Sequence, residues 1–191
     1  MIEVCPPVAP GFARCLTEMV VAGGPQPETS AAGDFVPAGF SPDQIKIAHE
    51  LPMGRRAGRG QTIAIVSAFD SPTVEADLAV FSKQFGLPRC TTANGCFTKV
   101  NDTGGTTYPP ADAGWALESN LDVQWAHAIA PGAKILLVEA NSISFPDLFR
   151  AVNYAVRNAS YLSGSWGSVE FAGQTIFDPL LRFPGVSKFF A

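Results

Sequence analysis

The stretch WALESNLDVQWAHAI, residues 115–129, has the apolar spacing of a helix that packs on one side. At about 100° per residue, one arc of this helix is apolar. Its members are Leu117, Leu121, Trp125, Ala128 and Ile129, with Trp115 at the edge. The opposite arc predicts a solvent face with a surface histidine, His127; its members are Ser119, Asn120, Gln124 and His127.

Two acids, Glu118 and Asp122, interrupt the apolar arc one helical turn apart. Like charges at this spacing cost about 0.2–0.5 kcal/mol even when exposed. Burying them costs more unless they share a proton or gain partners. Groups held at such a cost are typical of catalytic sites. Three interpretations stay open: a general base with its orienting partner, a structural hydrogen-bond network, or a helix that is only half buried.

Apolar runs flank this helix in the chain. Residues 61–66 and 134–139 are continuous apolar stretches, typical of strands buried on both faces of a parallel sheet. Amphipathic helices are predicted over residues 73–85 and 144–158. This alternation predicts a three-layer α/β domain with a parallel sheet.

Weaker patterns complete the order of elements. They predict a short helix from residue 41, strands over 97–100, 161–167 and 185–191, and a helix over 174–183. Ligands of such sheets bind beyond the carboxyl ends of the strands, where residues 67–70 and 165–167 are expected. The loop after the first strand, SAFDSP, lacks GxGxxG, so no nucleotide site is predicted.

Composition excludes several kinds of partner. The chain has 191 residues, 47% of them hydrophobic and 16% charged, with a net charge of −4. It has no basic run, so nucleic acid and an anionic membrane are not expected partners. No apolar stretch approaches the ~20 residues that span a bilayer. Residues 1–39, rich in Pro, Gly and Ala, predict an irregular arm, linker or propeptide tail ahead of a domain over residues 40–191.

The four cysteines form two locally closed pairs, Cys5/Cys15 and Cys90/Cys96. Metal ligation is the competing interpretation, but the spacings are not CxxC and no histidine lies near either pair in the sequence. Disulfides are therefore expected, and with them an oxidising, extracellular setting. The first residues show no signal peptide, so the natural start of the protein is expected further upstream.

Four segments, in this order along the chain, resemble the sedolisin family of serine-carboxyl peptidases, whose fold is similar to that of subtilisin. They are FSPDQIKIAHELP (40–52), GRGQTIAIVSAFDSPTVEADLAVFSKQFGLP (58–88), Glu118-Ser-Asn-Leu-Asp122 followed by a Pro-Gly-Ala-Lys-Ile turn, and SWGSVEF (165–171). The Glu-x-x-x-Asp pair is the most specific of them. The resemblance runs from about residue 37 to the last residue. It implies the N-terminal portion of a subtilisin-like domain that is incomplete at its C-terminus.

The resemblance also implies a chemistry. In this family the glutamate, here Glu118, takes the proton of a catalytic serine, and the aspartate, here Asp122, holds the glutamate. A carboxylate base has a reference pKa near ~4, so the enzyme is expected to cleave proteins in acid. Ser165, Trp166 and Gly167 are expected to line the peptide cleft, their backbone pairing with an extended substrate. A secreted monomer with a propeptide is expected.

The chain departs from the family pattern in three ways. It ends at GVSKFFA, before the aspartate that stabilises the oxyanion, and no segment matches the Gly-Thr-Ser of the nucleophile. The family's calcium site, near its C-terminus, is absent for the same reason, so no metal or cofactor is expected in this chain. Ser67 stands where the family has an acid, with Asp70 three residues on.

The missing nucleophile bears directly on activity. Ser163, Ser165 and Ser168 lie near the expected cleft, but none opens a helix as the nucleophile should, so the chain alone is expected to be nearly inactive. The alternatives are a truncated, non-catalytic module that at most binds extended peptides, or a chain that folds poorly because it exposes apolar sheet edges.

Overall fold

The computed structural model of the chain describes residues 1–19 and 39–190. Its main sheet has five strands, and every neighbouring pair in it is parallel. Across the sheet the order is β5, β6, β4, β7, β9. The strands are β4 (Thr62–Ala68), β5 (Phe97–Asn101), β6 (Lys134–Ala140), β7 (Tyr161–Gly164) and β9 (Ser187–Phe190).

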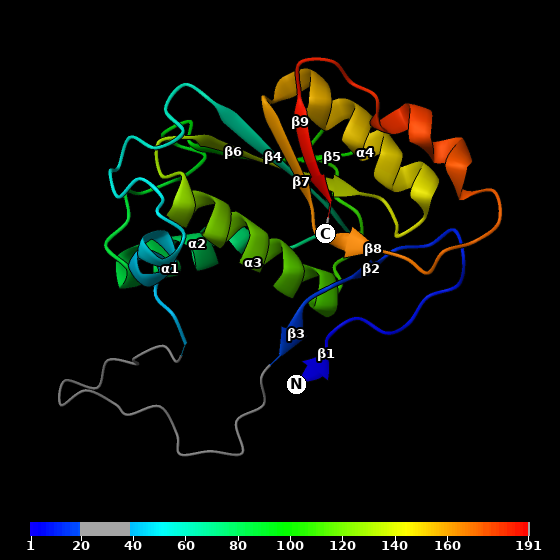
Figure 1. Cartoon of the computed structure of the whole chain (residues 1–191), viewed down its shortest axis with the longest axis horizontal. Coiled ribbons are helices and arrows are strands. Elements are labelled where there is room, and N and C mark those ends of the chain that lie inside the picture. The colour runs from blue at the N-terminus through cyan, green and yellow to red at the C-terminus, as the bar shows by residue number, and fades with distance from the viewer. Residues whose placement is uncertain (20–38, 191) are drawn as a thin grey trace.

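Helices cover both faces of this sheet, with α2 and α3 on one side and α4 on the other (Figure 1). The helices are α1 (Pro42–Ala48), α2 (Val74–Gln84), α3 (Ala113–Ile129), α4 (Phe145–Asn158) and a 3₁₀ helix, η1 (Gln174–Leu181). No helix of residues 1–19 and 39–190 is long and apolar enough to cross a membrane.

The alternation of side chains along β4 divides the interior into two cores. Ile65 packs with Leu78 of α2 and Val123 of α3, whereas Val66 packs on the other face with Leu148 of α4. Strands buried on both faces in this way have the continuous apolar sequence seen in the chain. The predicted three-layer α/β domain with a parallel sheet is confirmed.

The first 19 residues are docked against this domain as short strands. β1 (Ile2–Glu3) pairs with β3 (Glu18–Met19), and β2 (Arg14–Cys15) pairs antiparallel with β8 (Trp166–Gly167). The strand expected over residues 161–167 is therefore split at Ser165, because β7 joins the main sheet and β8 joins β2. The expected arm over 1–39 lies in part, at residues 20–38, outside the described residues, and the division at residue 39 stays a prediction.

Both predicted disulfides are present. Cys5 is bonded to Cys15, and Cys90 to Cys96. Cys5, Cys15 and Cys90 are buried. The first bond ties the N-terminal arm (residues 1–19) to itself next to β2, and the second closes the loop that leads into β5.

The predicted orientation of α3 is wrong in part. Leu117 and Leu121, expected inside, are 37% and 41% exposed, while Ser119 and His127, expected outside, are fully buried. The two leucines instead face an open apolar hollow between α2 and α3, of about 700 Å³, which Phe81 also lines. The two polar side chains are buried because each has a hydrogen-bond partner, which offsets the cost of desolvation.

Candidate active site

Glu118 is buried in a pocket of hydrogen-bond donors supplied by the N-terminal arm. Its side chain is 3% exposed. Oε2 accepts hydrogen bonds from the backbone N–H of Leu16 at 2.7 Å, the backbone N–H of Thr17 at 2.7 Å and the Thr17 hydroxyl at 2.8 Å. Bonds of this kind to a charged oxygen are shorter and stronger than neutral ones. The arm therefore supplies the partners that a buried carboxylate requires.

Asp122, one turn further along α3, has different partners. Its Oδ1 accepts a hydrogen bond from the Ser165 hydroxyl at 2.8 Å, and Oδ2 is buried without a partner in the part of the chain that the structure describes. The pKa of Asp122 is raised to about 7, chiefly by burial; the bond from Ser165 lowers it and the charge of Glu118 raises it. Asp122 therefore exchanges its proton near neutrality rather than in strong acid.

A hollow of about 480 Å³ opens beside Asp122. Its walls come from α3, β4 and β7, and include Leu121, Trp125, Ile65 and Ser163. The sheet and α3 thus leave space for another group next to the acid. Of the predicted site residues, Asp122 lines this hollow and is bonded to Ser165, whereas Glu118 is bonded to the arm and does not line it.

Trp166 has two separate roles in the fold. Its side chain is 6% exposed, donates from Nε1 to the carbonyl oxygen of Val66 at 3.0 Å, and packs against Phe145 and Phe149 of α4. Its backbone and that of Gly167 pair with Arg14 and Cys15 of the arm. The side chain therefore belongs to the core, and the backbone is the part that meets an extended strand.

Ser67, at the end of β4, is bonded to α3. The Ser119 hydroxyl donates to the Ser67 oxygen at 2.7 Å, and both side chains are buried. Asp70, three residues further on, forms an ion pair with Lys99 of β5 instead of approaching the acids of α3. Neither residue lengthens a chain of carboxylates from Glu118.

Glu139 is a second buried acid, which the sequence interpretation missed. Its side chain is fully buried, Oε1 accepts a hydrogen bond from the Ser71 N–H at 2.9 Å, and Oε2 lies 3.7 Å from the Lys99 Nζ. Burial raises the pKa of Glu139 to about 7, and the charge of Asp70 adds to this effect, while the Ser71 bond and Lys99 oppose it. The signal that could have identified Glu139 from the sequence is its position as an acid at the end of the apolar run 134–139.

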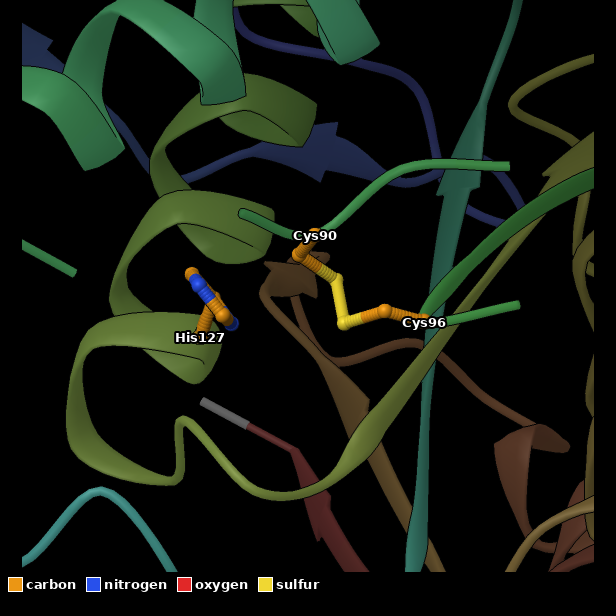
Figure 2. Close-up of side chains that lie close together, drawn as sticks. All are labelled: Cys90, Cys96 and His127. Atoms are coloured by element: carbon orange, nitrogen blue, oxygen red, sulfur yellow. A yellow bond between two sulfur atoms is a disulfide. The ribbon is translucent and has the colours of Figure 1, made fainter. Parts of the chain in front are cut away.

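His127 is also buried, and the expectation of a surface histidine is wrong. Its Nε2 lies 2.8 Å from the carbonyl oxygen of Pro88. Burial lowers the pKa of His127, the charge of Lys46 lowers it further, and the Pro88 bond opposes both effects. The ring lies beside the Cys90–Cys96 disulfide, as Figure 2 shows.

The family resemblance implies a calcium site further along the chain, and the expectation of no metal in this chain stays a prediction. Within residues 1–19 and 39–190, the group of three or more Cys, His, Asp or Glu side chains close enough to hold an ion is Cys90, Cys96 and His127. Its donors are sulfur and nitrogen, whereas calcium takes oxygen ligands.

Comparison with known proteins shows a likeness of structure and none of sequence. No family model and no curated protein matches the chain. Among solved structures, the chain is similar to Pseudomonas sedolisin, a serine-carboxyl proteinase, complexed with two molecules of pseudo-iodotyrostatin. The identity is 21% and the TM-score 0.48, over 65% of this chain and 34% of the sedolisin chain. The chain thus spans about a third of the length of that protein.

Proposed function

We propose that the chain is part of a sedolisin-type serine-carboxyl endopeptidase that acts on proteins at acidic pH. Glu118 is its general base, Asp122 orients that base, and the backbone of residues 165–167 binds the substrate. The observation that carries the proposal is the course of the N-terminal arm. Arg14 and Cys15 pair with β8, and the next two residues donate hydrogen bonds to Glu118.

The course of the arm supports the binding of an extended peptide at this site. An extended peptide binds an open strand through main-chain hydrogen bonds, with side-chain pockets adding specificity. Here an extended segment pairs antiparallel with Trp166 and Gly167 and then delivers its N–H groups to a buried carboxylate. A substrate or a propeptide that followed the same course would bring its backbone to Glu118. In this proposal, residues 14–17 occupy the cleft in the way that the tail of a propeptide does.

The chemistry follows from the two acids. Glu118 would accept the proton of a serine hydroxyl as that oxygen attacks the peptide carbonyl. Ser165 donates a hydrogen bond to Asp122. Asp122 would keep Glu118 oriented and would compensate changes in the charge of Glu118 during the reaction. A carboxylate with an ordinary pKa near ~4 is ionised in mild acid, where a histidine base would be protonated. The nucleophile and the oxyanion donor would come from sequence outside residues 1–191.

The setting proposed for this enzyme is extracellular. Two disulfides, one of them fastening the arm, support an oxidising compartment. The proposed partners are protein substrates and the propeptide.

The test is proteolysis by the whole reading frame that contains these residues. We expect hydrolysis of an unfolded protein to be fastest within ~pH 3–5, a window set by carboxylate pKa values. Glu118→Gln should lower kcat by at least about 10³-fold, and Asp122→Asn by less, because only Glu118 moves the proton. Glu75→Gln is the matched control and should keep full activity, because this acid of α2 is bonded to Thr92 rather than to a residue of the site. Acid proteolysis that survives Glu118→Gln would refute the assignment.

A second candidate, a non-catalytic module that binds extended peptides, is favoured by the bond between Ser165 and Asp122. This bond leaves that serine on an acid rather than free in the cleft. Residues 1–191 alone are expected to bind a labelled peptide at pH 4 without cleaving it under either candidate. The two candidates separate in the whole reading frame, where cleavage that is lost in Glu118→Gln favours the enzyme and binding without cleavage favours the module. Cleavage lost in Ser165→Ala would make Ser165 the nucleophile and would exclude the module.

A further inference from the structure

A buried histidine and a cysteine pair meet at the end of α3. His127 lies in the last turn of that helix, and Cys90 and Cys96 close the loop between α2 and β5 (Figure 2). One ring nitrogen of His127 and the two sulfur atoms all lie within 4.8 Å of one another. The sequence did not predict this group, because the histidine is more than 30 residues from either cysteine.

The hydrogen bond of His127 determines which nitrogen is available. The Pro88 carbonyl only accepts, so Nε2 carries the proton in the neutral ring and Nδ1 keeps a free lone pair. The side chain is fully buried, and Nδ1 has no partner in the part of the chain that is described. A histidine that binds a metal commonly donates its other N–H to a backbone carbonyl. His127 already makes this bond, from Nε2 to the Pro88 carbonyl oxygen.

We propose that Cys90, Cys96 and His127 bind Zn²⁺ when the disulfide between the two cysteines is reduced. Two thiolates and one imidazole are ligands that zinc prefers, and a fourth position stays open to water or another ligand. The site lies in the loop before β5 and is independent of the acids on α3.

The geometry requires only small movements. Bond lengths of roughly 2.3 Å to sulfur and 2.0–2.1 Å to nitrogen place tetrahedral ligands roughly 3.6–3.8 Å apart. One of the two ring nitrogens of His127 and the two sulfurs start within 4.8 Å of one another, and the two cysteine Cα atoms are 4.9 Å apart. Once reduction frees the sulfurs, side-chain rotation is enough to place them around an ion.

The reaction is balanced with a phosphine as reductant. The phosphine supplies two electrons to the disulfide and becomes a phosphine oxide, whose oxygen comes from water, and the two protons of that water complete the thiols. Zn²⁺ then displaces both thiol protons and binds the neutral imidazole without releasing another. The loop over residues 90–96 is consequently closed in both redox states, by a covalent bond when oxidised and by a metal when reduced.

The test uses Co²⁺ as a spectroscopic substitute for Zn²⁺. The phosphine-reduced protein should bind one Co²⁺ per chain, with a sulfur-to-cobalt charge-transfer band and the strong visible bands of tetrahedral cobalt. Added Zn²⁺ should remove both, and the oxidised protein should show neither. Both states use the unaltered chain, so the comparison does not depend on a variant that folds.

Three variants locate the site. His127→Ala should weaken Co²⁺ binding at least about tenfold, whereas His49→Ala, at the other histidine of the chain, should leave binding unchanged. Replacing Cys90 and Cys96 by Ser should abolish the charge-transfer band, and replacing Cys5 and Cys15 should preserve it. A reduced protein that binds no Co²⁺, or a spectrum that depends on Cys5 and Cys15, would overturn the proposal.

Discussion

Asp122 on α3, which is half-buried, and Glu139 on β6, which is fully buried, lie on the same face of the sheet, and the pKa of each is raised to about 7, chiefly by burial. Their surroundings differ. Glu139 faces the positive charge of Lys99 and accepts a backbone N–H. Asp122 faces a second acid and a serine hydroxyl, and it borders an open hollow.

The comparison shows that a perturbed pKa alone does not identify an active site. Structural ion pairs perturb the pKa of an acid as strongly as catalytic ones do. At Glu139 the positive charge of Lys99 compensates the charge of the carboxylate, so this acid has a structural role. Each acid has one oxygen without a hydrogen-bond partner in the described part of the chain, but at Asp122 no cation is among the causes of the pKa shift. The partners, rather than the magnitude of the shift, assign the candidate chemistry to α3.

The largest effect is expected where the charge compensation at Glu139 is removed. Lys99→Met leaves Asp70 and Glu139 without their cation, and should lower the free energy of unfolding by about 3 kcal/mol at pH 7. The loss should shrink at pH 5, where Glu139 is protonated. Urea denaturation at both pH values measures it. Lys134→Met, at an exposed lysine, is the control, and an equal loss there would show that the cluster has no special role.

The next effect concerns the pH dependence of stability at Asp122. The folded chain holds this proton with a pKa of about 7, against an ordinary value of 3.8, so ionisation opposes folding. The contribution of Asp122 to stability is therefore largest near pH 4 and is lost as the pH rises to 7, by on the order of 2 kcal/mol. Asp122→Asn removes this slope.

Denaturation curves at several pH values between 4 and 7 check this prediction. The unfolding free energy of Asp122→Asn should vary less with pH than that of the unaltered chain. Glu139→Gln should flatten the profile in the same direction, because the pKa of Glu139 is also raised. Profiles that stay parallel for Asp122→Asn would mean that this carboxyl group is charged throughout the range.

A smaller effect is expected at the contact between the arm and Glu118. Thr17→Val removes the hydroxyl that donates to Oε2 and leaves the two backbone donors in place. The variant should be about 1.5 kcal/mol less stable, since a hydrogen bond to a charged group is lost. Faster cleavage of the arm by an added protease measures the weaker docking. Thr98→Val, at an exposed threonine of β5, should not change that rate.

The smallest effect is expected at the serine pair behind α3. Ser67→Ala leaves the buried Ser119 hydroxyl without its acceptor and should cost about 1 kcal/mol. Replacing both serines by alanine should recover most of this loss, because no polar group is then left unpaired. A double-mutant cycle on the free energy of unfolding gives the coupling. Additive losses would show that the two hydroxyls act independently.

The sequence by itself determined the features that depend on near neighbours. Continuous apolar runs predicted β4 and β6, since a strand covered on both faces cannot carry polar side chains along most of its length. The cysteine pairs are 10 and 6 residues apart, so chain proximity favoured the bonds that formed. The spacing of Glu118 and Asp122 on a helix placed both near one side of α3.

Only the tertiary structure decided which partners each polar group has. Glu118 is bonded to residues about a hundred positions earlier, and Ser119 and His127 are buried because Ser67 and Pro88 lie opposite them. An apolar count along one helix contains no information on such partners, and so it placed Ser119 and His127 in solvent. The same reason hid the approach of His127 to Cys90 and Cys96. A side chain's burial is set by whatever packs against it, and in a parallel sheet those groups come from distant parts of the chain.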